Sequence, residues 1–300
     1  MKTKKNKTRA LALFSGGLDS ILAVKILQRQ GIEVTGLTFV SYFFDSKLAE
    51  KAAKQLNIKL KTVDISDEHL EIVKKPYYGR GKAMNPCIDC HLLMLKKAKE
   101  SAGKFDFIFT GDVLGERPMS QNKQALDLLE RKSDLKNELL RPLSAKLLEP
   151  TIPEKEGLVD RDKLLDISGR SRKRQMALAK KWGIKWYPSP GGGCILTDLQ
   201  FGQRLRELFE RWTDAKGNDV ILLKLGRHFW SNNDKLIVGR NKEENEKIKR
   251  LKQKGDIIIE PKEFPGPTIL VRSKTKISEK SLIKAKELMI KYSPKLKSMN

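Results

Sequence analysis

The sequence predicts an α/β fold, a parallel sheet with helices on both faces, followed by a smaller α+β domain. Two observations support this prediction. Short apolar runs alternate with helical patterns through the first half of the 300-residue chain, which is the order of strands joined by crossover helices. A proline- and glycine-rich stretch at residues 188–193 then interrupts the pattern, and the elements after it follow a different order.

Four apolar runs are expected to form the parallel strands, at residues 10–14, 33–40, 60–65 and 106–110. The helical patterns between them lie at residues 21–30, 47–56 and 90–102. The pattern becomes irregular over residues 132–157, and a basic helix is expected over residues 170–182. We place a domain boundary at the proline- and glycine-rich stretch, which gives domains of residues 1–190 and 191–300.

The smaller domain is expected to mix helices and strands. Its predicted elements are a helix at residues 199–213, strands near Val220, Leu236 and Ile257, and a final helix from Ser278. No internal repeat is apparent, so each element is expected to occur once.

A glycine-rich turn, residues 15–20 with the sequence Ser-Gly-Gly-Leu-Asp-Ser, joins the first predicted strand to the first predicted helix. Gly16 and Gly17 let the backbone approach a ligand closely, and the free N–H groups of a first helical turn bind anions. Ser15 and Ser20 add hydroxyl donors, and Asp19 is suited to capping the helix or binding Mg²⁺. The turn predicts a nucleoside triphosphate site, with a plain turn capped by Asp19 as the alternative. It is not a Walker motif, because no Gly-Lys-Ser/Thr follows.

The chain is strongly basic. It has 61 Lys and Arg residues against 37 Asp and Glu, a formal net charge of +24. This excess favours binding to a polyanion such as RNA, although a solvated lysine-rich surface would give the same count.

No stretch approaches the ~20 apolar residues of a membrane span, and the basic start has no apolar segment typical of a signal peptide. We therefore expect a cytoplasmic protein with no membrane partner.

The three cysteines, Cys87, Cys90 and Cys194, all lie in predicted turns or at helix starts. The spacing of Cys87 and Cys90 lets both thiolates reach one metal, and residues 191–193, all glycine, let Cys194 approach the same point. An iron–sulfur cluster held by three thiolates is the favoured interpretation. Zinc with His91 or His228 as a fourth ligand, and a redox pair that carries a persulfide, remain as alternatives. Haem attachment would require export.

The turn at residues 15–20 resembles the pyrophosphate loop of the N-type ATP pyrophosphatases, whose fold is Rossmann-like. That family includes tRNA thiolases, tRNA lysidine synthase and several amide-forming synthetases. The resemblance implies that ATP activates a substrate oxygen as an adenylate, that pyrophosphate is released, and that a nucleophile then displaces AMP.

Further motifs resemble the tRNA thiouridine synthases over residues 11–198. They are Gly36-Leu37-Thr38-Phe39, Asn85-Pro86 with Cys90 four residues later, and Thr110-Gly111-Asp112. Two-cysteine 2-thiouridylases usually carry Asp after Asn-Pro, where this chain has Cys87. The third thiol favours the cluster-dependent, non-redox type. Asp112 replaces the usual His, so its role as a base or as a nucleotide contact stays open.

Residues 223–291 resemble the NFACT-type RNA-binding domain. The motifs that carry this resemblance are Gly226-Arg227-His228-Phe229, the segment Ile237-Val238-Gly239-Arg240-Asn241, and the acidic run at residues 243–246. The resemblance implies that the smaller domain binds RNA.

Together these resemblances imply an ATP-dependent tRNA uridine sulfurtransferase. ATP would lie on Ser15, Gly16, Gly17, Asp19 and Ser20 with Mg²⁺, and its adenosine near Phe39 and Gly111. Cys87, Cys90 and Cys194 would hold a 4Fe-4S cluster, or zinc as the less favoured alternative, beside Asp112. The expected product is 4-thiouridine at tRNA position 8. The alternatives are 2-thiouridine at the wobble position by a persulfide or disulfide mechanism, a non-catalytic RNA-binding protein, and a ligase or amidotransferase acting on a small molecule.

The expected partners are tRNA and a sulfur donor, either inorganic sulfide or a desulfurase or carrier protein. Cations near predicted helix starts and loops would contact the phosphates. The candidate residues are Arg117, Arg170, Arg172, Lys173, Arg174, Arg227 and Arg240.

Overall fold

A computed structural model of the chain describes residues 7–189, 194–261 and 265–293. Contacts divide the chain into two units, Met1–Cys194 and Ile195–Asn300. The boundary predicted at residue 190 falls in the segment 190–193, outside the described residues. We describe each unit by itself.

The first unit is built on a five-stranded parallel sheet in the order β3-β2-β1-β4-β5. Its strands are β1 (Arg9–Leu13), β2 (Glu33–Val40), β3 (Lys59–Asp64), β4 (Phe107–Thr110) and β5 (Leu139–Leu140). The central strands are buried along most of their length, as expected of a sheet covered on both faces. The predicted α/β fold is confirmed.

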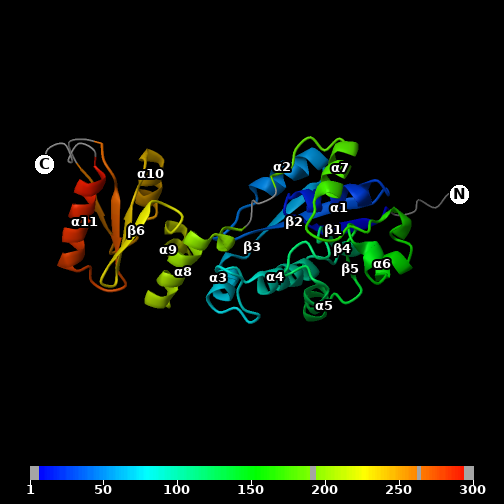
Figure 1. Cartoon of the computed structure of the whole chain (residues 1–300), viewed down its shortest axis with the longest axis horizontal. Helices are drawn as coiled ribbons and strands as arrows, with labels where there is room; N and C mark the ends of the chain where they lie inside the picture. The colour runs from blue at the N-terminus through cyan, green and yellow to red at the C-terminus, as the bar shows by residue number, and fades with distance from the viewer. Residues whose placement is uncertain (1–6, 190–193, 262–264, 294–300) are drawn as a thin grey trace. The chain divides into compact units, whose positions relative to one another are not determined.

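Helices cover both faces of this sheet (Figure 1). On one face lie α1 (Leu18–Gln28), α2 (Lys47–Leu56) and α7 (Lys173–Lys181), and on the other α3 (Ser66–Lys74), α4 (Cys87–Glu100) and α5 (Lys123–Lys132). Side chains alternate along β1, so Ala10 and Ala12 pack toward the first set and Leu11 toward the second. The short helix α6 (Ile152–Lys155) and the 3₁₀ turns η1 (Ala145–Leu147) and η2 (Arg161–Lys163) complete the described unit.

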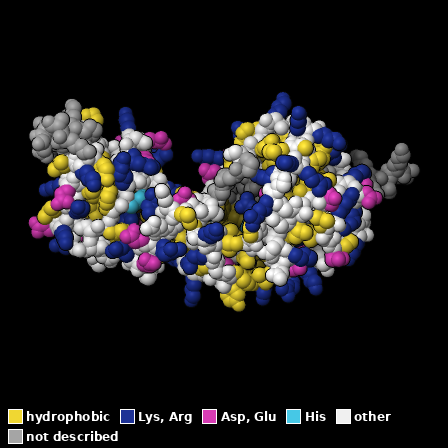
Figure 2. All heavy atoms as spheres, in the orientation of Figure 1, with side chains coloured by type: hydrophobic (Ala, Val, Ile, Leu, Met, Phe, Trp, Pro, Cys, Tyr) yellow, Lys and Arg dark blue, Asp and Glu magenta, His cyan; other side chains and the backbone are white. Residues whose placement is uncertain are grey.

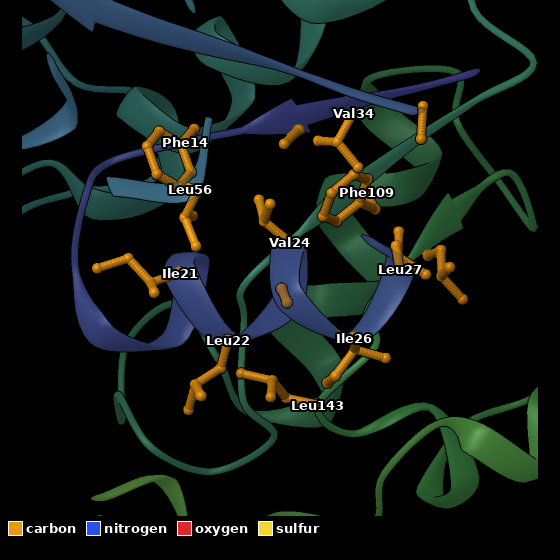
Figure 3. Close-up of a cluster of buried hydrophobic side chains, with 14 of the residues drawn as sticks. Phe14, Ile21, Leu22, Val24, Ile26, Leu27, Val34, Leu56, Phe109 and Leu143 are labelled. Atoms are coloured by element: carbon orange, nitrogen blue, oxygen red, sulfur yellow. The ribbon is translucent and has the colours of Figure 1, made fainter. Parts of the chain in front are cut away.

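Helix α1 is the most deeply buried helix next to the sheet. Ile21, Leu22 and Val24 are fully buried, and Figure 3 shows Val24 on the side of Phe14 and Phe109 and Leu22 on the opposite side of the helix, near Leu143. Each such side chain contributes roughly 1.5–3 kcal/mol when it leaves water. This packing fixes the first turn of α1 against the carboxyl edge of the sheet.

The second unit contains a four-stranded antiparallel sheet in the order β6-β7-β9-β8. The strands are β6 (Arg227–Ser231), β7 (Asp234–Val238), β8 (Ile257–Ile259) and β9 (Ile269–Arg272). The helices are η3 (Ile195–Thr197), α8 (Leu199–Arg211), α9 (Gly217–Leu222), α10 (Lys242–Arg250) and α11 (Glu279–Tyr292). Helix α11 packs on one face of the sheet, through Ala285 and Leu288, and α10 packs on the other, through Ile248.

The strand predicted near Val220 is wrong, because Val220 lies in α9. A short apolar run has the same periodicity in a buried strand and in a buried helix. Asp219 decides for the helix, since its carboxylate accepts a hydrogen bond of 2.9 Å from the backbone N–H of Lys216 at the helix start.

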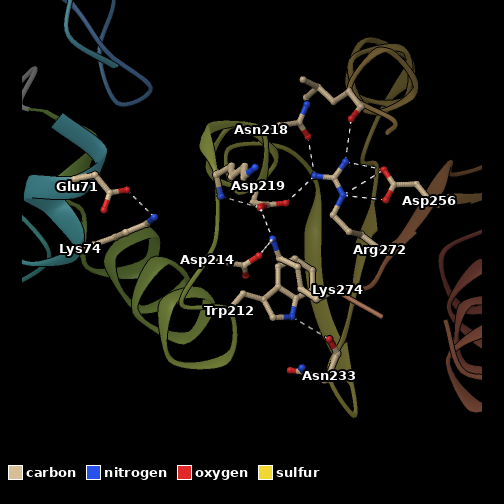
Figure 4. A network of polar contacts seen from close by, with 12 residues as sticks. Glu71, Lys74, Trp212, Asp214, Asn218, Asp219, Asn233, Asp256, Arg272 and Lys274 are labelled. Atoms are coloured by element: carbon tan, nitrogen blue, oxygen red, sulfur yellow. Dashed lines mark hydrogen bonds and ion pairs between the residues drawn. The ribbon is translucent and has the colours of Figure 1, made fainter. Parts of the chain in front are cut away.

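Arg272 links α9 to the sheet (Figure 4). Its guanidinium is 4% exposed and lies 2.8 Å from Asp219 and 2.6 Å from Asp256. Both carboxylates are buried as well, and Lys274 Nζ lies 3.3 Å from Asp219, so two cations offset the two carboxylates. Arg272 is therefore a structural residue and adds nothing to the positive surface.

Within the described residues, none of the helices combines the length and apolar character needed to cross a membrane.

Candidate functional site

The turn at residues 15–20 lies between the end of β1 and the start of α1. Gly16 has φ +75°, and a Cβ atom there would lie 2.4 Å from the backbone carbonyl carbon of Leu48, so only glycine fits. The Gly17 N–H donates to Ser15 Oγ (3.3 Å), and the Ser20 hydroxyl donates to the Gly17 carbonyl (2.9 Å). Gly17 is the N-cap of α1 and supplies no side-chain hydrogen bond to the first turn of the helix, which leaves the first-turn N–H groups suited to an anion.

Gly111 brings the end of β4 against the same helical turn. A Cβ atom at this position would lie 2.6 Å from the backbone nitrogen of Ser20. The carboxyl ends of neighbouring parallel strands thus meet at the turn, which is where such sheets bind ligands.

A charged cluster borders the turn. Arg172 Nη2 lies 2.6 Å from Asp19 Oδ2, and Arg172 Nε lies 3.5 Å from Glu116 Oε1. Burial and the charge of Asp19 raise the pKa of Glu116, against the opposing charge of Arg172. Asp19 Oδ1 is buried without a hydrogen-bond partner among the described residues. Two carboxylates thus share one guanidinium, and their remaining negative charge and free oxygen can bind a cation.

Asp112 follows Gly111 and receives hydrogen bonds from the Thr110 hydroxyl (2.8 Å) and the Gln121 amide (3.0 Å). Burial opposes ionisation, but the charges of His91 and Arg141, together with these two hydrogen bonds, lower the pKa of Asp112 overall. Asp112 is therefore a carboxylate at neutral pH.

Arg141 and His91 flank Asp112. Arg141 is buried, forms an ion pair with Glu130, and has its Nε 3.8 Å from Asp112 Oδ2. Burial lowers the pKa of His91, and the charge of Asp112 opposes that shift. Asp112 thus contributes a fixed negative charge beside the first turn of α4, where Cys90 lies.

Cys87 and Cys90 occupy the first turn of α4, and all three cysteines are partly buried. The side-chain amide of Asn85 donates to Cys87 Sγ (3.2 Å). Asp89 accepts backbone hydrogen bonds from Tyr77 and Tyr78, 3.0 Å each, which fixes the preceding loop on α4.

The three thiols are close enough to influence one another. Burial raises the pKa of Cys90, and the charges of Cys194, Cys87 and Asp89 raise it further. In residues 7–189, 194–261 and 265–293, no group of three or more His, Cys, Asp or Glu side chains is arranged to hold a metal ion. Residues 191–193, which we expected to bring Cys194 close, lie outside the described residues.

Phe39, a predicted adenosine contact, packs into the hydrophobic core with Leu37 and Ile65. It is 6% exposed, so a nucleotide contact at this position would come from its backbone rather than from its ring.

Some of the predicted RNA contacts interact with another side chain of the protein, and the others are simply exposed. Arg172 pairs with Asp19 at the glycine-rich turn, Arg174 pairs with Asp166 at 2.5 Å, and Arg240 pairs with Glu244. Arg227 stacks on Tyr292, with its Cζ 4.6 Å from the ring centroid. Exposed side chains complete the set, namely Arg117, Arg170 and Lys173.

Sequence reasoning missed three charged residues of the site. Glu116 follows β4 by six residues, and its place after a parallel strand was an available signal. Arg141 follows β5, a strand of two residues that left no pattern in the sequence. His91 was considered only as a zinc ligand, not as a neighbour of Asp112.

Comparison with known proteins adds independent information. Residues 8–138 match the family described as the tRNA methyl transferase HUP domain. Residues 226–299 match the NFACT protein RNA binding domain. The first match includes the turn at residues 15–20, Cys87, Cys90 and Asp112, and it ends before Cys194.

Curated relatives match parts of the first unit. The chain is 36% identical over 89 residues to a tRNA-specific 2-thiouridylase MnmA of Syntrophomonas wolfei, covering 28% of this chain and 26% of the relative. It is 34% identical over 117 residues to the protein of the same name from Sulfurimonas denitrificans, with 34% of each covered. It is 29% identical over 145 residues to a "Probable tRNA sulfurtransferase" of Thermococcus kodakarensis, covering 45% of this chain and 36% of the relative. The matches thus span between a quarter and just over a third of these relatives.

Two solved structures are also similar. One is a predicted subunit of a tRNA methyltransferase from Methanocaldococcus jannaschii, with TM-score 0.38, 20% identity, and 58% of this chain and 76% of that chain covered. The other is a 4-thiouridine synthetase–RNA complex with bound ATP, with TM-score 0.38, 17% identity, and 59% and 52% covered.

Proposed function

We propose that this chain is an ATP-dependent tRNA uridine sulfurtransferase. The observation that carries the proposal is that a glycine-rich turn at an uncapped helix start, an ionised Asp112 and a group of cysteines belong to one unit with a parallel sheet. Relatives named as thiouridylases and as a tRNA sulfurtransferase match the same unit, and an RNA-binding domain family matches the other.

The turn would hold the pyrophosphate portion of ATP. Ser15, Gly16, Gly17 and Ser20 offer hydroxyl and backbone N–H donors, and adenosine would lie beside the backbone at Phe39 and Gly111. Arg172 reaches the turn through its pair with Asp19, so its guanidinium can neutralise charge on the leaving pyrophosphate.

Mg²⁺ fits the residues beside the turn. Carboxylate oxygens are its preferred ligands, and Asp19 Oδ1 is buried without a hydrogen-bond partner in the described part of the chain. Burial and the charge of Asp19 raise the pKa of Glu116, and a cation would relieve the repulsion between the two carboxylates. Asp19 and Glu116 would hold the ion, which when bound neutralises phosphate charge.

The reaction has two steps. The uridine carbonyl oxygen attacks the α-phosphorus, an O–P bond forms, and pyrophosphate leaves. Sulfide then attacks the activated carbon, a C–S bond forms, and the C–O bond breaks with release of AMP. Asp112, ionised and oriented by Thr110 and Gln121, would position the uridine or accept its proton.

The cysteines would hold the group that delivers sulfide to the activated uridine. Three neighbouring thiolates repel one another, and this repulsion contributes to the raised pKa of Cys90. A bound cationic centre would remove that repulsion, and thiolates are the donors that iron–sulfur clusters use, although the described side chains are not arranged around a metal ion. Cys87, Cys90 and Cys194 would hold a 4Fe-4S cluster, which when bound supplies an iron with an open position for sulfide. Zinc on the same thiolates is the less favoured alternative.

The proposal is tested by pyrophosphate release from ATP with and without tRNA. We expect release that requires tRNA and that Asp19→Asn reduces by about 100-fold or more. Release without RNA would instead indicate a ligase or amidotransferase that acts on a small molecule. Absence of release under both conditions would indicate an RNA-binding protein without catalysis.

We propose 4-thiouridine at tRNA position 8 as the product, because Cys87 supplies the third thiol of the cluster-dependent type. The names of the relatives from S. wolfei and S. denitrificans favour 2-thiouridine as a second candidate. Nuclease digestion of the product tRNA followed by nucleoside chromatography distinguishes the two. A 2-thiouridine peak at the wobble position would replace the first assignment with the second.

A further inference from the structure

A group of polar side chains without partners lies between α8 and the β6–β7 hairpin of the second unit. We call Arg204, His228, Trp230 and Lys235 the hairpin cluster. Their nitrogens Arg204 Nε, His228 Nδ1, His228 Nε2, Trp230 Nε1 and Lys235 Nζ are buried and have no hydrogen-bond partner among the described residues. Buried polar groups are nearly always paired in folded proteins, so five such atoms on four neighbouring residues require an explanation.

Strand register places three of these side chains on one face of the sheet. Trp230 on β6 pairs with Lys235 on β7, and directly opposed residues of antiparallel strands project to the same side. His228, two residues before Trp230, shares that side. Lys235 Nζ lies 4.2 Å from the centroid of the Trp230 ring.

Helix α8 is fixed against this hairpin at its C-terminal end. The Arg211 guanidinium donates to the Asn232 carbonyl (3.0 Å), and the Trp212 indole N–H donates to the Asn233 carbonyl (3.1 Å). The rings of Trp212 and Trp230 meet edge to face, with centroids 5.2 Å apart. Arg204, two turns earlier on α8, is thereby directed toward His228 and Lys235, whose pKa values its charge lowers.

The cluster carries positive charge that its neighbours do not neutralise. Lys235 is 2% exposed. Burial lowers its pKa to about 8, the charges of Arg204 and Arg211 lower it as well, and only Glu207 opposes the shift. Burial and the charges of Lys235, Arg204 and Arg240 lower the pKa of His228 to about 3, and the nearby backbone of Leu223 opposes that shift. An anion beside these groups would supply the missing charge and accept hydrogen bonds.

The small void beside Lys235 does not account for the cluster. This void, lined by Lys235, Leu208 and Trp212, measures about 10 Å³, enough for one water molecule at most. Lys235 is the one cluster residue that lines it, so a water there would leave the nitrogens of Arg204, His228 and Trp230 without partners.

We propose that the hairpin cluster binds a phosphodiester group of RNA, with Arg204 and His228 at the partly exposed outer side and Lys235 beneath. This inference rests on the proposed function for the identity of the RNA. The segment that contains the hairpin matches the NFACT RNA binding domain, residues 226–299. Helix α8 precedes that segment, so the proposal assigns to RNA binding a helix that the match does not include.

The exposed cations predicted in this unit are less suited to the same role. Arg240 is paired with Glu244, and Arg227 is stacked on Tyr292. Lysine and arginine side chains nevertheless occur across the visible face of the unit (Figure 2), and these can attract RNA without holding a particular phosphate.

The test is tRNA binding by the full chain, measured by fluorescence anisotropy at several salt concentrations. Lys235→Met keeps the length of the side chain and removes its charge. We expect about tenfold weaker binding and a slope of log K against log salt that is smaller by about 0.9, the change for one lost phosphate contact. Lys254→Met, at an exposed lysine of the same unit, is the matched control and should change affinity by less than about twofold.

A thermal unfolding scan separates this loss from misfolding. Because Lys235→Met removes a buried charge without a partner, its midpoint should equal or exceed that of the native chain. If Lys235→Met does not fold, Arg204→Gln replaces it, with the same expected loss of affinity. Wild-type affinity and salt slope in a folded variant would overturn the proposal.

Inorganic phosphate distinguishes a small-anion site from an RNA site. Its titration is followed through the Trp230 indole N–H signal in NMR, assigned with Trp230→Phe. A shift with phosphate at micromolar concentration, together with tRNA binding unchanged in Lys235→Met, would assign the cluster to free phosphate and overturn the RNA proposal.

Pyrophosphate release is measured in parallel. If Lys235→Met binds tRNA weakly while the native chain forms no thiouridine, the proposed function fails and the RNA site stands.

Discussion

The sequence around Arg172 indicates an RNA contact, but the structure places the side chain at the glycine-rich turn. It lies in a run of basic residues that suggests a phosphate-binding helix start, yet the structure pairs it with Asp19 and Glu116. Its neighbours Arg170 and Lys173 remain exposed. Burial and the position of the nearest carboxylates, which the linear sequence does not show, separate the two roles.

Arg172→Met should therefore reduce ATP-dependent pyrophosphate release far more than Lys173→Met. We expect a loss of roughly 100-fold in kcat/KM for Arg172→Met, since a charge on the leaving group is left without its partner. Lys173→Met should change the same constant by less than about twofold. Equal effects of the two substitutions, or an effect of Arg172→Met on tRNA affinity alone, would contradict the placement of Arg172 at the turn.

The cysteines provide a second test at the level of single residues. Replacement of Cys87, Cys90 or Cys194 by Ser should abolish sulfur transfer, because each thiolate has a proposed ligand role, while the affinity for ATP stays within about twofold. Isothermal titration with ATP and thionucleoside analysis of the product measure the two properties separately. Full sulfur transfer by Cys194→Ser would exclude the three-thiolate site and favour a pair made by Cys87 and Cys90.

His69 predicts how stability depends on pH. The side chain is fully buried with its Nδ1 2.8 Å from Ser41 Oγ, and burial lowers its pKa to about 4. In the unfolded chain His binds a proton near pH 6.5, so the unfolded state takes up the proton first. The stability tied to neutral His69 is complete above pH 6.5 and is lost as the pH falls toward about 4.

We expect that loss to reach about 2 kcal/mol in the free energy of unfolding at pH 5. Urea unfolding of the native chain and of His69→Gln at pH 7 and pH 5 measures it. The difference between the two proteins should shrink by that amount at pH 5. A difference that does not change with pH would show that His69 is protonated within the fold.

At the scale of elements, the approach of β4 to α1 positions the candidate site. Gly111 has a backbone contact with Ser20 that no side chain fits, and Gly16 has a similar one with Leu48. Only the fold shows that Gly111 brings the end of β4 against α1 and that Gly16 brings the turn after β1 against the start of α2.

Gly111→Ala should separate these elements. The added Cβ would lie 2.6 Å from Ser20 N, so we expect a loss of about 1–3 kcal/mol in stability and at least tenfold weaker ATP binding. Gly103→Ala, where a Cβ meets no atom within 4 Å, is the control and should bind ATP normally. Normal ATP binding by a folded Gly111→Ala protein would show that β4 does not shape the nucleotide site.

The elements that the sequence predicted share strong local signals. The first four strands of the sheet and helices α1, α2 and α4 follow clear apolar periodicity. The misses have physical causes: β5 has two residues, and α9 has the apolar content of a strand. Nothing in the local sequence indicates that Arg272 is buried between Asp219 and Asp256 in the fold.

For the candidate site, motifs located the turn, the cysteines and Asp112, because these residues follow or precede elements with clear patterns. Arg141 and Glu116 could not be found this way, because the charged residues that they contact in the fold lie far from them in the sequence. Arg141 reaches Asp112 only after β5 joins the sheet. The hairpin cluster likewise combines α8 with β6 and β7, and no segment of the sequence contains it.

At the scale of the whole molecule, the net charge of +24 and the spread of Lys and Arg over the visible face of both units (Figure 2) favour a polyanionic substrate. If tRNA is the substrate as proposed, sequence-independent phosphate contacts would supply much of the affinity, and their strength would depend on salt. The hairpin cluster would add one fixed contact to this general attraction.

The affinity of the native chain for tRNA should fall on the order of 100-fold when salt rises from 50 to 200 mM. Filter binding with tRNA, and with a DNA duplex as a comparison for general charge, measures this. An affinity that does not depend on salt would show that the basic residues serve solubility rather than RNA binding.

The most direct test of the proposed function is to incubate the anaerobically purified chain with tRNA, ATP and labelled sulfide, and to quantify thiouridine, AMP and pyrophosphate together. The account predicts labelled thiouridine in tRNA, formed in equal amounts with AMP and pyrophosphate, and none without ATP. Hydrolysis of ATP without a thionucleoside, or thiolation that does not require ATP, would contradict it.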